Sequence, residues 1–180
     1  MALAAVGATP RGGVNRQALT AGEAEAWRLL IGWGAEAGLE PSTDPAGNLF
    51  LALAGRDRSA PPVLAGSHID TQPTGGRFDG AFGVVAALDA AARLAEAGKA
   101  PARDVVVVAW MNEEGSRFAP GMMGSDAFAG VRPLPDILAA TDAAGISVAT
   151  ALACLHAAVP DRSMPPCRRP RSLGRHVPKS

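Results

Sequence analysis

The stretch Gly66–Gly83, GSHIDTQPTGGRFDGAFG, decides how the rest of this 180-residue chain is interpreted. It begins within an apolar run, residues 62–67, that is typical of a buried β-strand. His68 and Asp70 are spaced H-x-D at the end of this run, and residues two apart share one face of a strand. We therefore expect the Asp70 carboxylate to lie beside the His68 imidazole, as an acid does when it holds a metal-bound histidine in place.

Further acidic residues follow at two other positions. Asp79 comes after a turn-rich loop, residues 71–77, and Glu113–Glu114 follows the most apolar run of the chain, residues 105–110. In α/β proteins, ligands bind outside the carboxyl ends of the strands. Imidazole and carboxylate groups are also common ligands of divalent metal ions. The sequence therefore predicts a metal site at one edge of a sheet.

Each of these residues also has an ordinary structural explanation. His68 alone is more often a hydrogen-bonded histidine of the core, and Asp70 and Asp79 are typical of turns and helix caps. The pair Glu113–Glu114 alone is more often part of a solvated loop. Their combination at successive strand ends favours the metal site, but spacing by itself leaves the two explanations nearly balanced.

Hydrophobic periodicity predicts an α/β fold. A strand at 62–67, a helix at 80–97 and a strand at 104–110 form a strand–helix–strand unit, which makes its two strands parallel. We expect a three-layer sandwich with a mixed, largely parallel sheet. The other expected elements are a loop over 1–19, a helix over 20–37 that starts with the capping box Thr20–Glu23, a strand over 48–54 and short helices over 125–129, 134–140 and 147–155.

Composition limits the partners of the chain. The residues up to 159 include 11 basic and 16 acidic side chains, and such an acidic body is atypical of proteins that bind nucleic acid. No apolar run is long enough to predict a membrane span. The two cysteines, Cys154 and Cys167, are too few for a disulfide framework and fit a reducing compartment. We expect a cytoplasmic protein with neither a nucleic acid nor a membrane as its partner.

Two long motifs carry a resemblance to a known family. GSHIDTQPTGGRFDGAFGV, residues 66–84, and NEEGSRFAPGMMGSDAF, residues 112–128, resemble the hydantoinase/carbamoylase-type amidases. These enzymes belong to the aminoacylase–carboxypeptidase clan of metallohydrolases. They include N-carbamoyl-L-amino-acid hydrolases, allantoate amidohydrolases and β-ureidopropionases. The resemblance covers about residues 7–152.

The resemblance implies a role for each candidate residue. His68 would bind one metal ion, Asp79 would bridge two ions, and Glu114 would bind the second. Glu113 would be the general base and acid, and Asp70 would orient His68. The family uses two divalent ions per site, namely zinc, with manganese, cobalt or nickel as alternatives. It cleaves C–N bonds in linear amides such as N-carbamoyl amino acids and ureido compounds, and its members are homodimers.

The chain also departs from the family pattern. Family members are much longer, and their further ligand histidines and their lid and dimerisation domain have no counterpart here; His156 and His176 match no family motif. We therefore expect residues 1–155 to form part of a catalytic domain that is incomplete and inactive. Residues 156–180, rich in Arg and Pro, are expected to be a disordered tail with the character of translation in a shifted reading frame.

Two other functions stay open on the sequence. The chain could be a non-catalytic fragment or binding module that uses its basic tail. It could also be an exopeptidase or aminoacylase of the same clan, which would keep the ligands and change the substrate. The details GGRFDGAFG and EEGSRF favour the carbamoylase-type amidases over this last alternative.

Overall fold

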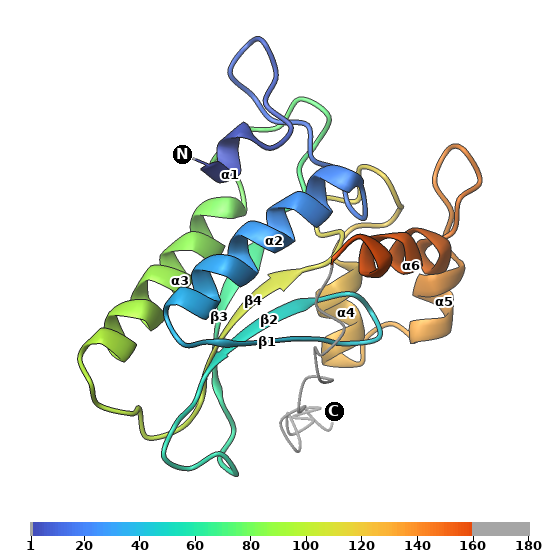
Figure 1. Ribbon diagram of the computed structural model, residues 1–180. Helices are drawn as coiled ribbons and strands as arrows, with labels where there is room; N and C mark the ends of the chain where they lie inside the picture. The colour runs from blue at the N-terminus through green and yellow to red at the C-terminus, as the bar shows by residue number, and fades with distance from the viewer. Residues whose placement is uncertain (1, 160–180) are drawn as a thin grey trace, which may run out of the picture.

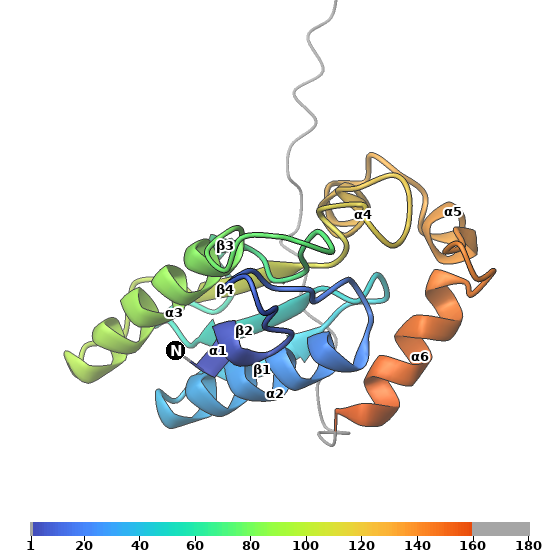
Figure 2. The same ribbon diagram turned by 90° about the horizontal axis from the view of Figure 1, so that it is seen from above.

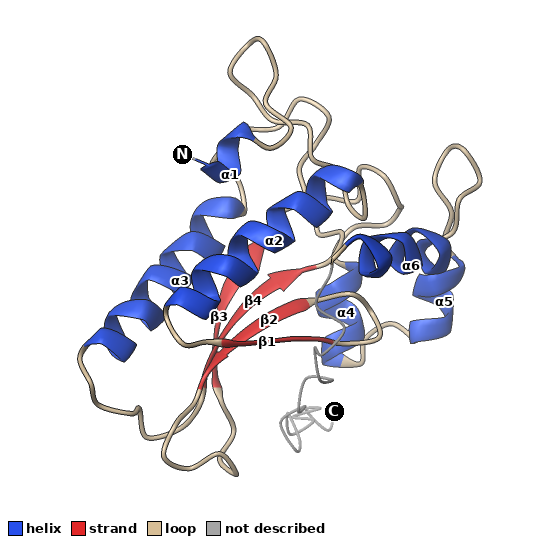
Figure 3. Cartoon of the chain, in the orientation of Figure 1, coloured by secondary structure: helices blue, strands red, loops and turns tan. Residues whose placement is uncertain are grey.

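The fold, seen in a computed structural model that describes residues 2–159, is a four-stranded sheet with helices packed around it (Figures 1 and 3). Each helix and strand expected from the sequence has a counterpart in the structure, which adds a short helix and a short strand. In chain order they are α1 (Ala2–Ala5), α2 (Ala21–Glu36), β1 (Glu40–Thr43), β2 (Leu49–Leu53), β3 (Val63–His68), α3 (Ala81–Glu96), β4 (Val105–Trp110), α4 (Met123–Ala129), α5 (Leu134–Ala139) and α6 (Val148–Ala158).

The sheet is mixed, as predicted, with the strand order β1-β2-β4-β3. The β3–β4 pair is parallel because α3 connects these strands, whereas β1–β2 and β2–β4 are antiparallel. The expectation of a largely parallel sheet is therefore wrong for the described residues. Both antiparallel pairs involve β2, whose direction the sequence pattern does not give. Strand β1 was not expected, because it is four residues long and contains Pro41, a residue tolerated in edge strands.

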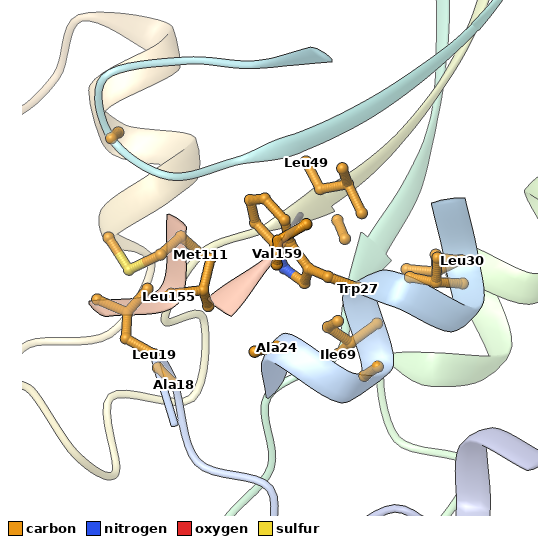
Figure 4. Close-up of a cluster of buried hydrophobic side chains, with 14 of the residues drawn as sticks. Ala18, Leu19, Ala24, Trp27, Leu30, Leu49, Ile69, Met111, Leu155 and Val159 are labelled. Atoms are coloured by element: carbon orange, nitrogen blue, oxygen red, sulfur yellow. The ribbon is translucent and has the colours of Figure 1, made fainter. Parts of the chain in front are cut away.

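One face of the sheet packs against α2 and α3. Val107 and Ala109 of β4 alternate toward this face, where they join Trp27 and Leu30 of α2 and Leu88 of α3 in the main core. Figure 4 shows the part of this core around Trp27 and Leu30, and Figures 1 and 2 show α2 and α3 running along the sheet. The alanine-rich α3 fits closely, so its packing confirms the expected helix against the sheet.

The opposite face of the sheet holds a smaller apolar cluster. Phe50, Val106 and Val108 are buried there, and Trp110 and Phe128 pack against them. The Trp110 and Phe128 ring centroids are 5.2 Å apart, so α4 is fixed close to the carboxyl end of β4. The segment 111–122, which carries the two glutamates, connects β4 to α4, so this contact fixes both of its ends.

Strand β3 lies at the edge of the described sheet and is not the buried strand that we predicted. Val63 is 51% exposed and Leu64 is 38% exposed, and only His68 at the end of the strand is buried. An apolar run predicts a strand but does not tell whether another strand covers it, which explains the error.

The start of α2 differs in detail from the expected capping box. The Thr20 hydroxyl accepts a hydrogen bond from the Glu23 N–H, as predicted. The Glu23 carboxylate, however, accepts from the N–H of Leu19 instead of Thr20. Glu23 is 2% exposed, so the cap also buries an acidic group.

Both ends of the described chain are more ordered than predicted. Residues 2–5 form α1, with Leu3 buried, where a loop was expected. Helix α6 continues to Ala158, and the buried Val159 follows it, so the helix expected over 147–155 is longer than predicted. The rest of the expected disordered tail, residues 160–180, lies outside the described residues. Within residues 2–159, no helix combines the length and apolar character needed to cross a membrane.

Candidate metal centre

The parallel pairing of β3 and β4 brings their carboxyl ends together. His68, the last residue of β3, is the register partner of Trp110, the last residue of β4. Beyond Trp110, Asn112 adopts a left-handed conformation with φ of 50° and its side-chain nitrogen donates to the Phe118 carbonyl. The chain therefore turns there. The glutamates at 113 and 114 lie beyond the carboxyl ends of the strands, on the same side of the molecule as His68, as the sequence predicts.

The imidazole of His68 is hydrogen-bonded at Nδ1 and faces two carboxylates at Nε2. Its Nδ1 lies 2.9 Å from the backbone oxygen of Asp70. Donation from Nδ1 to this carbonyl leaves the Nε2 lone pair free in the neutral ring, the arrangement of a metal-binding histidine. Nε2 lies 3.3 Å from Glu113 Oε2 and 3.7 Å from Asp79 Oδ1.

Gly80 lets the loop after β3 pass directly against this ring. A Cβ at position 80 would lie 2.5 Å from Cε1 and Nε2 of His68, too close for any side chain. The residue also has φ of 62°, which favours glycine. Because Gly80 is the N-cap of α3, this close approach places Asp79 beside the imidazole.

Asp70 ties the two strand ends together. Its carboxylate is fully buried and accepts hydrogen bonds from the backbone N–H groups of Glu113 and Glu114, each at 3.2 Å. The sequence interpretation placed this carboxylate beside the His68 ring, and Oδ1 does lie 3.5 Å from Nδ1. The shorter contact to the ring comes from the Asp70 backbone oxygen, and the side chain also positions the glutamate loop.

The three predicted ligands form one group. His68, Asp79 and Glu114 each offer a ligand atom, and these atoms all lie within 4.8 Å of one another. Glu114 Oε1 is buried and has no hydrogen-bond partner among the described residues, as expected of an oxygen reserved for a cation. One nitrogen and two carboxylate oxygens suit zinc, manganese, cobalt or nickel, so the residues present fit a divalent ion.

The charges around His68 favour a cation. Burial lowers the pKa of His68, but its hydrogen bonds to Asp70 and the charges of Asp70 and Glu113 outweigh burial and raise the pKa to about 9. Without a metal, the imidazole therefore holds a proton at neutral pH. A divalent ion placed at Nε2 would take the position of that proton and satisfy the same acids.

Two buried charged residues that the sequence analysis did not assign to the site lie beneath it. Arg16 donates to the backbone oxygens of Ile69, Leu3 and Val6, and so fixes the segment between His68 and Asp70. Burial and the charge of Asp70 raise the pKa of Glu23 to about 8. No sequence pattern marks a buried arginine, whereas Glu23 was found only as a capping residue.

His156 does not belong to the ligand group of the described residues. It lies on α6, with its ring centroid 6.2 Å from that of Trp27, and burial lowers its pKa. His176 lies outside the described residues.

Comparison with known proteins identifies the family. A sequence profile of peptidase family M28 matches residues 48–160, which is more than half of the chain and includes every candidate ligand. The chain belongs to peptidase family M28. The match begins just before β2 and ends after α6, so this M28 unit includes the sheet edge described above.

Curated relatives confirm the resemblance to the carbamoylase-type amidases. The M28 chain is 46% identical to the N-carbamoyl-L-amino-acid amidohydrolase of Rhizobium meliloti over 82% of its length. It is 41% identical to the N-carbamoyl-L-amino acid amidohydrolase of Geobacillus stearothermophilus over 98% of its length, and 37% identical to the allantoate amidohydrolase of Bacillus subtilis over 83%. The matched parts are 35%, 43% and 36% of these three proteins.

A solved structure shows the same fold. The hydantoinase/carbamoylase family amidase of Burkholderia ambifaria superposes with a TM-score of 0.84 and 48% sequence identity, over 86% of this chain and 38% of that one. The Geobacillus match covers 98% of the chain, whereas the Rhizobium and Bacillus matches cover 82% and 83%, so the interpretation of residues 156–180 as a shifted reading frame stays a prediction. The chain thus spans about 40% of the length of its relatives.

Proposed function

We propose that this M28 chain carries part of the active site of a metal-dependent hydrolase that cleaves C–N bonds in linear amides. The observation that carries the proposal is the cluster of His68, Asp79 and Glu114, with Glu113 beside it, at the carboxyl ends of β3 and β4, where open α/β sheets bind ligands. The similarity to amidohydrolases of N-carbamoyl amino acids and allantoate supports a small N-carbamoyl or ureido compound as the substrate.

The geometry supports different roles for the two adjacent glutamates. One oxygen of Glu114 is hydrogen-bonded to the Gln72 amide, and the other is buried with no partner within residues 2–159, as suits a fixed ligand. The Glu113 side chain is one third exposed, 33%, and faces His68. A partly exposed carboxylate can turn between two proton-transfer partners, so Glu113 is the better general base.

The proposed reaction follows from these positions. A divalent ion bound by His68, Asp79 and Glu114 would acidify a water molecule and polarise the substrate carbonyl. Glu113 accepts the proton of the attacking water and then delivers it to the leaving nitrogen, so that the C–N bond breaks without forming a free amide anion. Asp70 holds the backbone of Glu113 in place through both steps.

The described residues supply three ligands, the number of protein ligands in many single-ion catalytic zinc sites. The family pattern expects two ions, with Asp79 between them. We propose that residues 2–159 bind one ion, and bind it weakly, because each of the two expected ions would lack a histidine. Turnover by the 180-residue chain is expected to be low for the same reason.

The test combines metal binding with turnover. Purified chain is titrated calorimetrically with Zn²⁺, Mn²⁺ and Co²⁺ and then assayed against N-carbamoyl-L-amino acids and allantoate. Asp79→Ala is expected to lose metal binding, whereas Glu113→Gln is expected to keep metal and lose any turnover, since an amide cannot accept the proton. If the unmodified chain turns a substrate over measurably, a Glu113→Gln variant with the same rate would assign proton transfer to another group. Two tight metal sites would contradict the single weak site.

A peptide substrate is the second candidate, because the matched family is described as a peptidase family. Peptide and ureido substrates share the same attack on a carbonyl carbon and differ in the leaving group. Dipeptides and N-acyl amino acids therefore belong in the same assay. Turnover of these compounds above that of N-carbamoyl amino acids would favour the exopeptidase or aminoacylase assignment.

A further inference from the structure

Gln72 contacts a proposed metal ligand although no sequence motif suggested it. It lies in the exposed loop four residues beyond the end of β3. Its side-chain nitrogen donates to Glu114 Oε2 at 2.7 Å and also approaches the Glu114 backbone oxygen at 3.3 Å. One side-chain amide thus binds both the carboxylate and the main chain of a single residue.

Three hydrogen bonds besides those of this amide hold the glutamate loop. The Asp70 carboxylate already holds the N–H groups of Glu113 and Glu114. The Ser116 hydroxyl donates to the Thr71 backbone oxygen at 3.1 Å. These three bonds fix the backbone, so what the Gln72 amide adds is control over the rotation of the Glu114 carboxylate.

The consequence is that the two carboxylate oxygens of Glu114 differ. Oε2 is occupied by the Gln72 amide, whereas Oε1 is buried and has no hydrogen-bond partner among the described residues. A free carboxylate can bind a cation through one oxygen or through both. A carboxylate with one oxygen already occupied is restricted to the other.

We propose that Gln72 is a positioning residue that presents Oε1 of Glu114 to the metal ion and keeps Oε2 out of its coordination. This inference rests on the proposed function, because it requires Glu114 to be a ligand. Partners that hold a metal-binding side chain typically change metal affinity by about 10- to 100-fold when they are removed. The Gln72 amide is the exposed member of the set that holds Glu114, so it is removable without disturbing the core.

Cobalt binding provides a test with a readout other than activity. Gln72→Met replaces the amide by a side chain of similar length that cannot donate a hydrogen bond. We expect the affinity for Co²⁺ to fall about tenfold or more and the visible absorption bands of bound Co²⁺ to shift in position and intensity, because a second carboxylate oxygen can then approach the ion. Gln17→Met is the matched control, since Gln17 is the other glutamine of the chain and lies outside the ligand group.

A double-mutant comparison separates this inference from the function on which it rests. Glu114→Gln should abolish most Co²⁺ binding, and adding Gln72→Met to that variant should change the remaining affinity no further. Unchanged Co²⁺ binding in Glu114→Gln would overturn the ligand assignment itself. Loss of binding in Glu114→Gln, with wild-type affinity and spectrum in Gln72→Met, would overturn the role of Gln72 alone.

Discussion

Metal binding should release a proton from His68, and the size of this release follows from the acids around the ring. Hydrogen bonds to Asp70 and the charges of Asp70 and Glu113 raise the pKa of His68 to about 9 despite burial. At pH 7 the metal-free imidazole is then about 99% protonated, whereas an ordinary histidine with a pKa of about 6.5 is about one quarter protonated. Each bound ion should therefore release about one proton at pH 7 in place of about one quarter.

The same competition predicts how affinity changes with pH. Below a pKa of about 9, each unit of rising pH should strengthen metal binding about tenfold, so the apparent affinity at pH 7 is about 100-fold below its limit at high pH. Calorimetric titration of Mn²⁺ at pH 7 in two buffers with different heats of ionisation counts the released protons. A series from pH 6 to 8.5 then gives the slope.

Asp70→Asn is the informative variant for this measurement. It removes the charge that raises the pKa of His68 but keeps the backbone oxygen that accepts from Nδ1. Proton release at pH 7 should fall toward one quarter of a proton per ion, as for an ordinary histidine near about 6.5. Wild-type release near one quarter, together with an affinity that does not change between pH 7 and 8.5, would refute the argument that these acids hold a proton on His68.

Three further predictions concern the packing of the site, a buried acid and the exposed strand. Gly80→Ala should lower metal affinity by about tenfold or more, because its Cβ would collide with the imidazole; Gly76→Ala, which has no atom within 4 Å of its Cβ, is the calorimetric control. Between pH 4.5 and about 8, the folded state keeps a proton on Glu23 that the unfolded state releases, so the free energy of unfolding falls by up to about 1.4 kcal/mol per pH unit as the pH rises. Glu23→Gln should flatten this fall, as measured by urea denaturation. An unchanged slope would place the ionised form in the core. Leu64→Lys should reduce self-association in sedimentation experiments because it charges an exposed edge strand, whereas Val131→Lys, at another exposed position, should not.

The fold could be predicted from the sequence where residue patterns are long. The run that became β4 is central and buried, and the alanine-rich helix α3 lies against the sheet as its composition indicates. Strand β1 could not be predicted because four residues with one proline carry too little periodicity. The exposure of β3 could not be predicted either, since an apolar run reports only that a strand needs cover and not whether neighbouring strands provide it.

The candidate ligands could be predicted because they occupy the ends of two strands that one helix makes parallel. Because of this topology, His68 and Glu114 lie in one ligand group although they are 46 residues apart in the sequence. Their supporting partners could not be predicted, because they reach the site through contacts that have no periodicity. Arg16 crosses from the amino-terminal segment to a backbone oxygen, and Gln72 reaches across from an adjacent loop.

This division between ligands and supporting residues has a physical basis. A ligand must be an imidazole or a carboxylate, so its residue type reveals its chemistry even in a bare sequence. A supporting group needs only a hydrogen-bond donor in the right place, which an amide, a guanidinium or a backbone N–H can supply equally well. Asp70 combines both situations: its spacing from His68 is visible in the sequence, while its buried carboxylate serves the backbone of Glu113 and Glu114. The residues that set metal affinity and proton release at this site therefore include Gln72 and Asp70 as well as the ligands, and variants at these two positions test the proposed centre without removing a ligand.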